Sequence, residues 1–540
     1  MGILTSGMVV APQPAAVEVG ARVLQSGGNA FDAAIATAFA QMVVDPQMCG
    51  IGGFGCLTKY DARRDDVTVI DFNARAGQNA TPDQWADAIV DEIWTGYGWA
   101  LRGHVNDVGY GAIGTPGTLA GLAELHRTSA TRPWAELLQP AIDLARNGFL
   151  VSPELAALWN SPDTGDLIGI GTRIRFNDES RRLYLKNGAD PYVPGELFRN
   201  PEYAATLERL AALGPEEFYT GELAREVADD LDRNGSTITL DDLRSYQVTT
   251  HTPVEGTYLG HDIRTNHAPG GGPSVIEILN ILEGDDLPAL GHNSEDYIYT
   301  VARAQIAAMI DRAEHVGDPA FVDVPTDRLT SKAHADRWRT RLATGERLIA
   351  PRYHPDGRTT TNVSVIDRDG NCIALTHTLG ASSGVVAPGR GFMYNNAMNC
   401  FDPRPGQVNS IAPGKGRITG IAPTIAFADD KPAVVLGAPG GTRIMTGVFN
   451  VLVNVIAFGM SAVEAVSAPR FDCQSDTLDG EARIPSWVLQ GAADRAGLKR
   501  WNNPAPYGHF ALVQAIVVDP TSGKVAGGAD PRSGGAAMAG

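Results

Sequence analysis

The sequence predicts an α+β protein in which layers of helices cover β-sheets. Apolar residues recur at helical spacing through much of the first 340 residues, whereas β-branched runs dominate three regions, around 255–265, 424–437 and 511–518. A further pair of such runs flanks Asp369-Gly370, a dipeptide that favours tight hairpin turns. With 540 residues, 43% of them hydrophobic, the chain can bury a large core, and we expect one large body.

The N-terminal region begins with two predicted helices, from Pro14 to Ser26 and from Phe31 to Val44. Gly27-Gly28 separates them, and Asn29 is a candidate N-cap of the second. Gly50 to Gly55 formally matches the dinucleotide pattern G-x-G-x-x-G, but the residues that follow alternate like a strand pair. Because a dinucleotide loop opens a helix, we interpret these glycines as a turn.

Thr115-Pro116 predicts another helix start, with Thr115 as N-cap and Pro116 in the first turn. Similar patterns predict helices over 134–146, 201–213, 222–233, 274–282, 294–315 and 331–342. The glycine- and proline-rich stretch 403–416 predicts a loop rather than a domain linker.

Charge and composition narrow the range of partners. The net charge of −18, with no compensating Lys/Arg run, argues against nucleic acid and membrane surfaces and favours a small or peptide-like substrate. The longest apolar stretch, 447–460, is too short to cross a bilayer. No secretory signal pattern follows Met1, and the five cysteines lack C-x-x-C pairing, so we expect the cytoplasm.

The segment 359–380 predicts a hairpin that brings threonines together. A two-residue turn at its Asp-Gly pair places Thr361 opposite Thr378, with Thr360 as a diagonal neighbour of Thr378. A threonine hydroxyl becomes a good nucleophile when a base takes its proton, and a free α-amino group on the same residue can be that base. The polar stretch 351–358 suits an exposed loop that ends at a scissile bond. From these residues alone, however, such a cluster is more often a matter of β-propensity than of catalysis.

The glycine pair Gly440-Gly441 lies between an apolar, strand-like run, 433–436, and a predicted helix. A strand, a glycine turn and a helix start can direct unpaired N–H groups at one point, as the stabilisation of an oxyanion requires. The alternative is a tight turn in which glycine supplies a positive φ.

A second candidate nucleophile is Ser382, which lies in a G-x-S-x-G pattern at 380–384 after a predicted strand. A nucleophile elbow of the α/β-hydrolase type must enter a helix. The residues after 384 instead continue as a β-like run with proline and glycine, so this interpretation is disfavoured.

An ordered set of motifs resembles the γ-glutamyltranspeptidase family over essentially the whole chain. Around the hairpin they are Thr360-Thr361, S-V-I-D at 364–367, D-G-N at 369–371, T-x-T-L at 376–379, S-G-V-V at 383–386 and N-N at 395–396. Elsewhere they are G-N-A-F-D-A-A at 28–34, G-I-G-G-F-G at 50–55, G-T-P-G-T at 114–118, A-P-T-I at 422–425, G-A-P-G-G-T-R at 437–443, A-P-R-F at 468–471 and D-P-R-S at 530–533.

The resemblance implies the four-layer αββα sandwich of the N-terminal-nucleophile hydrolases. It also implies self-cleavage between Thr359 and Thr360 into a large subunit, 1–359, and a small subunit, 360–540, which could pair further into a dimer of such heterodimers. Thr360 would be the nucleophile, Thr378 would position it, and Gly440 and Gly441 would hold the oxyanion. No metal or organic cofactor is implied.

The resemblance weakens in the substrate pocket. The family's carboxylate-binding arginine falls on Asn73, with Arg75 two residues on and on the same face of a strand as a possible substitute. The family's other substrate-binding positions also carry different residues, namely Gly380, Ala397, Cys400, Thr419 and Gly420.

We therefore expect an amidohydrolase or acyltransferase whose acyl group is not ordinary γ-glutamyl. Two alternatives stay open. One is a glutathione-type γ-glutamyl hydrolase or transpeptidase with a rebuilt pocket, and the other is a non-catalytic binding protein on the same fold.

Overall fold

Two β-sheets packed face to face form the centre of the molecule. The computed structural model describes residues 4–92, 98–165, 167–351, 360–502, 510–519 and 521–540. The strands of the first sheet are, in spatial order, β20 (Ala536–Ala539), β1 (Met8–Ala11), β11 (Thr361–Ile366), β12 (Cys372–Thr378), β2 (Phe54–Asp61), β3 (Asp66–Phe72) and β8 (Thr249–His251). Those of the second sheet are β19 (Val525–Gly528), β18 (Gln514–Val518), β14 (Lys431–Gly437), β13 (Thr424–Ala428), β10 (His261–Thr265) and β9 (Val254–Tyr258).

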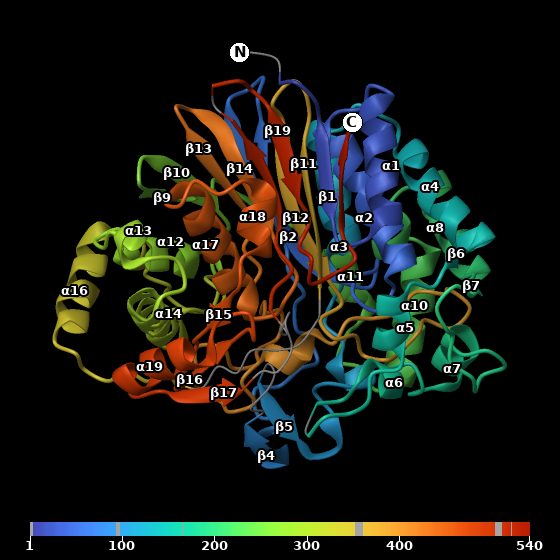
Figure 1. Cartoon of the computed structure of the whole chain (residues 1–540). Coiled ribbons are helices and arrows are strands. Elements are labelled where there is room, and N and C mark those ends of the chain that lie inside the picture. The colour runs from blue at the N-terminus through green and yellow to red at the C-terminus, as the bar shows by residue number, and fades with distance from the viewer. Residues whose placement is uncertain (1–3, 93–97, 166, 352–359, 503–509, 520) are drawn as a thin grey trace.

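Helices cover the outer face of each sheet, and they lie on opposite sides of the molecule (Figure 1). Against the first sheet lie α1 (Pro14–Gln25), α2 (Ala30–Val44), α3 (Thr118–Ser129), α4 (Trp134–Asn147), α8 (Pro201–Leu213), α9 (Glu216–Tyr219), α10 (Glu222–Arg233) and α11 (Leu240–Ser245). Against the second lie α12 (Gly272–Leu282), α13 (Leu287–Leu290), α14 (Glu295–His315), α16 (Lys332–Ala343), α17 (Arg443–Ile456), α18 (Ala462–Ser467) and α19 (Ser486–Ala496). The predicted four-layer αββα sandwich is confirmed.

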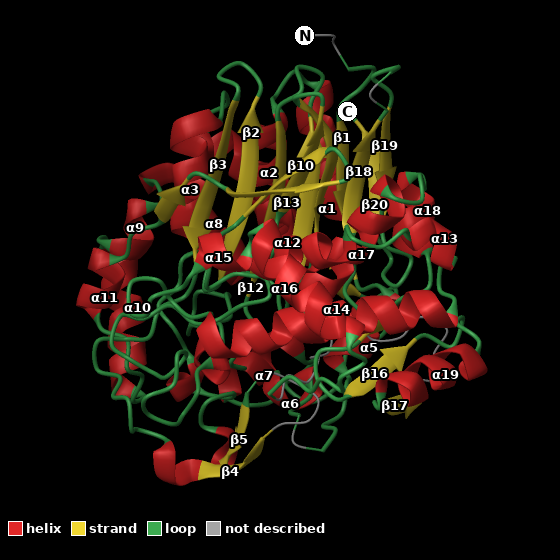
Figure 2. Ribbon diagram, turned by 90° about the vertical axis from the view of Figure 1, so that its left-hand side faces the viewer, coloured by secondary structure: helices red, strands yellow, loops and turns green. Residues whose placement is uncertain are grey.

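Three apolar cores correspond to the three interfaces between these layers. One lies between the first sheet and its helices, one between the second sheet and its helices, and a smaller one between the sheets, where Ile366 and Val435 are fully buried. In a view turned by 90°, the strands of both sheets run nearly parallel to one another, as in aligned sheet packing (Figure 2). All fifteen residues of α2 are buried, because this helix is covered by other helices as well as by strands β11 and β12.

Smaller elements lie at the periphery. They are α5 (Pro153–Trp159), α6 (Ile170–Arg173), α7 (Asp178–Tyr184), α15 (Thr326–Leu329), β4 (Ile89–Glu92), β5 (Trp99–Leu101), β6 (Phe149–Leu150), β7 (Leu197–Phe198), β15 (Phe471–Asp472), β16 (Thr477–Gly480), β17 (Lys499–Asn502) and four short 3₁₀ helices at Ala86–Ala88, Arg102–His104, Tyr110–Ala112 and Ala397–Cys400. Within the described ranges, the structure contains no helix with the length and apolar character needed to cross a bilayer.

Two predicted helix starts have different outcomes. The Asn29 side chain accepts the backbone N–H groups of the first turn of α2, and Asp32 completes a reciprocal capping box, as expected for an N-cap. Thr115 is not an N-cap: α3 begins at Thr118, and Thr115 instead donates its backbone N–H to the carbonyl of Arg75 over 2.8 Å.

The register of the β11–β12 hairpin differs by one residue from the prediction. Thr361 pairs with His377 and not with Thr378. Extending this register by one residue places Thr360 directly opposite Thr378 rather than diagonal to it.

The cause of this shift is the length of the turn. Asp367 and Asn371 are joined by a backbone hydrogen bond of 3.0 Å, so three residues rather than two form the loop between them. Gly370 alone takes a positive φ, +87°, after a turn closed by its N–H on the Asp367 carbonyl. A type I turn followed by a left-handed glycine is the usual three-residue hairpin, and it uses Asp-Gly as readily as the shorter turn does.

Candidate active site

Thr360 immediately precedes the central strand β11, and the residue is 7% exposed. Its φ is +84°, a region that β-branched residues avoid because Cβ crowds the backbone. Such a conformation costs about 1–3 kcal/mol and persists where the surroundings enforce it. Thr359 and almost all of the predicted loop before it fall in 352–359, outside the described residues.

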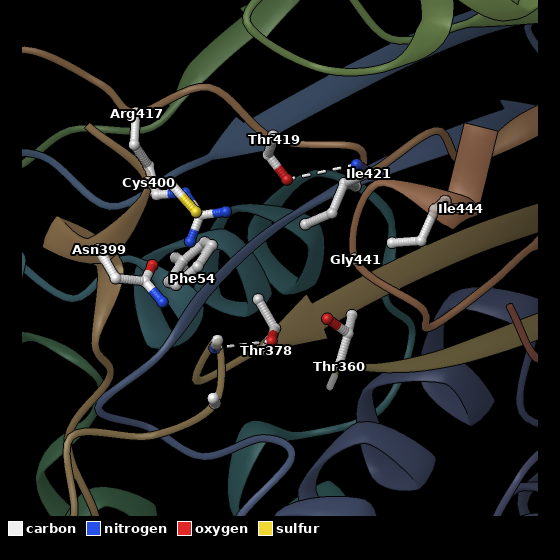
Figure 3. A pocket seen from close by; sticks show the side chains of 12 residues that line it. Phe54, Thr360, Thr378, Asn399, Cys400, Arg417, Thr419, Ile421, Gly441 and Ile444 are labelled. Carbon is white, nitrogen blue, oxygen red and sulfur yellow. Dashed lines mark hydrogen bonds between the residues drawn. The ribbon is translucent and has the colours of Figure 1, made fainter. Parts of the chain in front are cut away.

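Thr360 lines a pocket of about 300 Å³, including its opening, at the end of the strands (Figure 3). One lining residue, Phe54, comes from the chain before Thr360, and the others come from Thr360 onwards. The described lining residues are Phe54, Thr360, Thr378, Gly380, Ala381, Asn399, Cys400, Arg417, Thr419, Ile421, Gly441 and Ile444. Four of the predicted site residues besides Thr360 and Gly441 are therefore brought together here, namely Thr378, Gly380, Cys400 and Thr419.

Thr378 closes strand β12 beside Thr360, and the two side chains lie near each other in Figure 3. The Thr378 hydroxyl accepts the backbone N–H of Gly380 over 2.8 Å. This bond fixes the rotamer of Thr378 and leaves its own hydroxyl proton available to a neighbouring oxygen. The geometry suits a group that orients the Thr360 hydroxyl.

A buried polar network lies around Thr361, the residue that follows Thr360. The Gln41 amide donates to the Thr361 hydroxyl over 2.9 Å and to the Gln13 side chain over 2.7 Å, and its oxygen lies 3.0 Å from His377 Nε2. Burial lowers the pKa of His377 to about 3, so the ring is neutral. The network fixes the first residue of β11 and therefore the direction in which Thr360 leaves the strand.

Asp45 extends this network towards α2. Its Oδ2 accepts from Gln13 Nε2 over 2.6 Å, whereas its Oδ1 is shielded from solvent without a hydrogen-bond partner among the described residues. Burial raises the pKa of Asp45 to about 7, and the Gln13 hydrogen bond only partly offsets that rise.

Gly440 and Gly441 form the turn between β14 and α17, with φ values of +141° and +60°. Within the described residues, neither backbone N–H donates a hydrogen bond. Gly441 lines the pocket, and Gly440 packs against Ala511 so closely that a Cβ would lie 2.6 Å from its Cα. The turn therefore has the strand, glycine and helix geometry that the sequence predicted, and its two N–H groups have no acceptor among the described residues.

Two further predicted pocket residues lie one layer behind the lining. Ala397 packs with Phe54 and Ala74 in a small apolar cluster. Gly420 adjoins the Gly440-Gly441 turn, since a Cβ there would lie 2.3 Å from the Gly441 carbonyl oxygen. Both positions are too crowded for the polar side chains that the family resemblance places there.

Asn73 and Arg75 do not line the pocket. Arg75 directs its guanidinium over the Tyr246 ring, 5.3 Å from the centroid, and donates to the Gln247 carbonyl over 3.0 Å. The expectation that Arg75 faces the acyl group is therefore wrong in this structure. Asn73 is buried and donates its amide to the backbone carbonyl of Arg417 over 2.7 Å.

Among the described lining residues that the sequence analysis missed, Arg417 is the charged one; the others are Phe54, Ala381, Asn399, Ile421 and Ile444. Arg417 is 4% exposed, and its guanidinium carbon lies 4.8 Å from the centroid of the Phe54 ring. The signal that could have revealed it is a lone arginine at the end of the 403–416 loop, two residues before Thr419.

The rejected sequence interpretations fail in the structure as well. Gly53 is followed by strand β2 rather than by a helix, so the glycines at 50–55 form a turn. Ser382 is fully buried with a φ of +64°, and the described residues after it enter no helix until Ala397.

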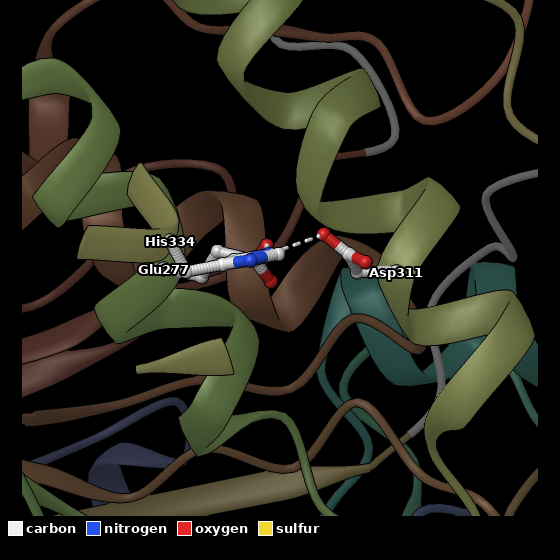
Figure 4. Close-up of side chains that lie close together, drawn as sticks. All are labelled: Glu277, Asp311 and His334. Carbon is white, nitrogen blue, oxygen red and sulfur yellow. Dashed lines mark hydrogen bonds and ion pairs between the residues drawn. The ribbon is translucent and has the colours of Figure 1, made fainter. Parts of the chain in front are cut away.

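One group of side chains outside the pocket is close enough to hold a metal ion in the described part of the chain: Glu277 of α12, Asp311 of α14 and His334 of α16 (Figure 4). His334 Nδ1 lies 3.2 Å from the Arg337 guanidinium, which can only donate, so Nε2 carries the proton and donates to Asp311 over 2.8 Å. Burial raises the pKa of Glu277 far above its usual value. His334 contacts both carboxyl groups and so links the three helices, although Glu277 Oε1 is buried without a hydrogen-bond partner among the described residues.

The fold and the pocket together define the class of N-terminal-nucleophile hydrolases, with a threonine at the start of a central strand. Comparison with known proteins gives the family. The family model described as gamma-glutamyltranspeptidase matches residues 16–540, and the chain belongs to this family.

The relatives include both acylase proenzymes and glutathione hydrolase proenzymes. The chain is 38% identical over 496 residues to the Acylase ACY 1 proenzyme of Pseudomonas sp. (strain V22), covering 91% of this chain and 86% of that one. It is 34% identical over 554 residues to the glutathione hydrolase proenzyme of Escherichia coli (strain K12), covering 98% and 90%. Among solved structures, cephalosporin acylase from Bacillus halodurans superposes with a TM-score of 0.88 at 28% identity, covering 99% of this chain and 96% of that one.

Proposed function

We propose that this chain is a self-processing amidohydrolase that works through an acyl-Thr360 intermediate. The observation that carries the proposal is the placement of Thr360: buried, held at a strained positive φ, and in one pocket with Thr378 and Gly441. Family membership supports an amidohydrolase or acyltransferase made as a proenzyme. The strain supports cleavage before Thr360, because φ ceases to be constrained once the preceding peptide bond is gone.

Self-cleavage and turnover use the same hydroxyl. In the precursor, Thr360 Oγ attacks the carbonyl carbon of residue 359, the peptide C–N bond breaks, and water hydrolyses the resulting ester to free the Thr360 amine. In turnover, Oγ attacks the substrate amide while its proton passes to that amine, which then protonates the leaving nitrogen. Water releases the acyl group and restores the hydroxyl. The Gly440 and Gly441 N–H groups stabilise the oxyanion in each step.

The acyl group is one without an α-ammonium. No carboxylate is present among the described residues that line the pocket, and Cys400 stands where the family resemblance expects an aspartate. An ammonium buried without a counter-charge costs several kcal/mol, so γ-glutamyl donors are poor substrates. The 38% identity to an acylase proenzyme supports this assignment.

The alternative is a γ-glutamyl hydrolase or transpeptidase with a rebuilt pocket. The observation in its support is the 34% identity to a glutathione hydrolase proenzyme. A non-catalytic binding protein is disfavoured, since binding alone requires neither a strained threonine nor a nearby glycine turn whose N–H groups find no acceptor within the described ranges.

The test combines intact mass with an acyl panel. We expect products that correspond to 1–359 and 360–540, loss of cleavage and turnover in Thr360→Ala, and partial retention of both in Thr360→Ser. A panel of N-acyl anilides that vary only the acyl part then identifies the donor. An active enzyme that stays a single 540-residue chain would contradict the mechanism.

A further inference from the structure

We propose that Glu277, Asp311 and His334 form a binding site for a divalent transition-metal ion of the Zn²⁺ type, which cross-links three helices over the second sheet. The inference is independent of the proposed function, because none of these residues belongs to the described lining of the catalytic pocket. The ion would hold the helical layer together rather than take part in acyl chemistry.

The three side chains come from three helices, two of which, α14 and α16, pack against the third, α12 (Figure 4). All eleven residues of α12 are buried, and Glu277 lies in the middle of this helix. Asp311 lies near the end of α14, and His334 lies in the first turn of α16, where the Ser331 side chain accepts its backbone N–H. Each helix follows from its own local signals, whereas packing brings the three groups together.

The candidate ligand atoms are spaced as a small ion requires. His334 Nε2 lies 2.8 Å from Asp311 Oδ2 and 3.3 Å from Glu277 Oε1, and one ligand atom from each residue lies within 4.8 Å of the others. A tetrahedral ion with ligands at about 2.0–2.2 Å holds them about 3.3–3.6 Å apart, so shifts of about 1 Å or less bring the three atoms into place. Two carboxylates, one neutral imidazole and a divalent ion sum to no net charge, which suits a buried site.

One oxygen of the cluster has no hydrogen bond. The neutral His334 ring has a single N–H on this side and donates it to Asp311, so Glu277 Oε1 is buried without a partner among the described residues. A buried polar oxygen without a partner is destabilising, and native structures contain few of them. One proton cannot bond fully to both carboxyl groups, whereas a cation between them can bind both.

The groups around the cluster also suit an ion. Trp338 donates its Nε1–H to Asp311 Oδ2 over 2.5 Å, and partners of this kind orient ligating carboxylates. The side chains of His334 and Asp311 are 7% and 8% exposed, so solvent reaches the cluster. Arg337 contacts His334 Nδ1 but is itself exposed, so its guanidinium can turn into solvent when Nδ1 carries the ring proton and Nε2 binds the ion.

The experiment titrates the whole purified protein with ZnCl₂, after dialysis against EDTA, and follows binding by calorimetry and by thermal melting. We expect one equivalent of Zn²⁺ per chain and a Tm that rises with Zn²⁺ concentration, because the ion binds the folded state. Glu277→Gln keeps the size of the side chain but loses the anionic ligand. This variant and His334→Gln should each weaken binding roughly tenfold or more and remove the rise in Tm.

His251→Gln is the matched control. The rings of His251 and His267 lie 5.0 Å apart and form another pair of histidines that could take up Zn²⁺. The control should therefore keep the equivalent of Zn²⁺ and the rise in Tm that the wild-type protein shows. Loss of both in His251→Gln would place the ion elsewhere and overturn the inference.

Co²⁺ in place of Zn²⁺ tests the site without a variant, and so decides the matter even where a substitution prevents folding. Carboxylate and imidazole ligands give visible ligand-field bands without thiolate-to-cobalt charge transfer, whereas any of the five cysteines as ligand would add that charge transfer. A wild-type protein that takes up no Zn²⁺, undiminished binding in both Glu277→Gln and His334→Gln, or a Co²⁺ adduct with thiolate charge transfer would overturn the inference. None of these measurements uses turnover, so they leave the proposed function to its own test.

Discussion

Gly440→Ala tests whether the turn between β14 and α17 holds the oxyanion. A Cβ at this position would lie 2.6 Å from Ala511 Cα and 2.8 Å from Ala511 Cβ. Carbon atoms pack at about 3.5–4.0 Å, so the turn and the Ala511 backbone must separate by roughly 1 Å. The φ of +141° adds strain, because residues with a Cβ rarely adopt it. Displacing an oxyanion donor by this distance should lower kcat roughly a hundredfold.

Steady-state kinetics on the preferred anilide, with gel analysis of self-cleavage and a thermal melt, check this prediction. KM should change little, because the N–H groups contact the oxyanion that forms during reaction rather than the ground-state amide. Gly459→Ala is the control: Gly459 has a φ of +65° with open space around it, so alanine costs only about 1 kcal/mol of stability and leaves kcat unchanged. A folded Gly440→Ala enzyme with wild-type kcat would refute the assignment of this turn.

Three other perturbations follow from the structure. Thr360→Gly and Thr360→Ala both lack the hydroxyl and should stay uncleaved. Glycine tolerates the positive φ and alanine does not, so urea unfolding should show Thr360→Gly to be more stable than Thr360→Ala by roughly 0.5–2 kcal/mol. Equal urea midpoints would mean that Thr360 is unstrained. The raised pKa of Asp45 gives stability that is present below about pH 4 and lost as pH rises towards 7. Asp45→Asn should therefore reduce the change in unfolding free energy across this pH range by roughly 4 kcal/mol. The products 1–359 and 360–540 should co-elute in native size-exclusion chromatography and separate only in denaturant.

The layers could be predicted from the sequence, because long helices carry strong periodic signals. Helices α8 and α10 have the predicted bounds, and α1, α4, α12, α14 and α16 differ by only one or two residues at their ends. Strands β1 and β20 were not predicted. Each is only four residues long, and its extended conformation depends on pairing with the neighbouring strand more than on the β-propensity of its own residues.

The positions of the candidate catalytic residues could be predicted from motifs, whereas the charged residue in the pocket could not. Motif spacing fixes Thr360 and the glycine turn because both lie at strand ends within short segments. Arg417 enters the pocket through pairing between segments about 340 residues apart, and no local pattern records that pairing. The expectation for Arg75 failed for the same reason: strand β3 ends at Phe72, before Asn73 and Arg75, and the Arg75 guanidinium lies over the ring of Tyr246.

The sheet order explains why the two cleavage products would stay together. In the first sheet, β1 lies between β20 and β11, and β12 pairs with β2, so strands from before and after Thr360 alternate three times. In the second sheet, β10 of the first product pairs with β13 of the second. Separation would break four strand pairings and expose apolar faces of all three cores. A cut before Thr360 thus releases strain and an amine at one strand end while the rest of the fold keeps both pieces in place.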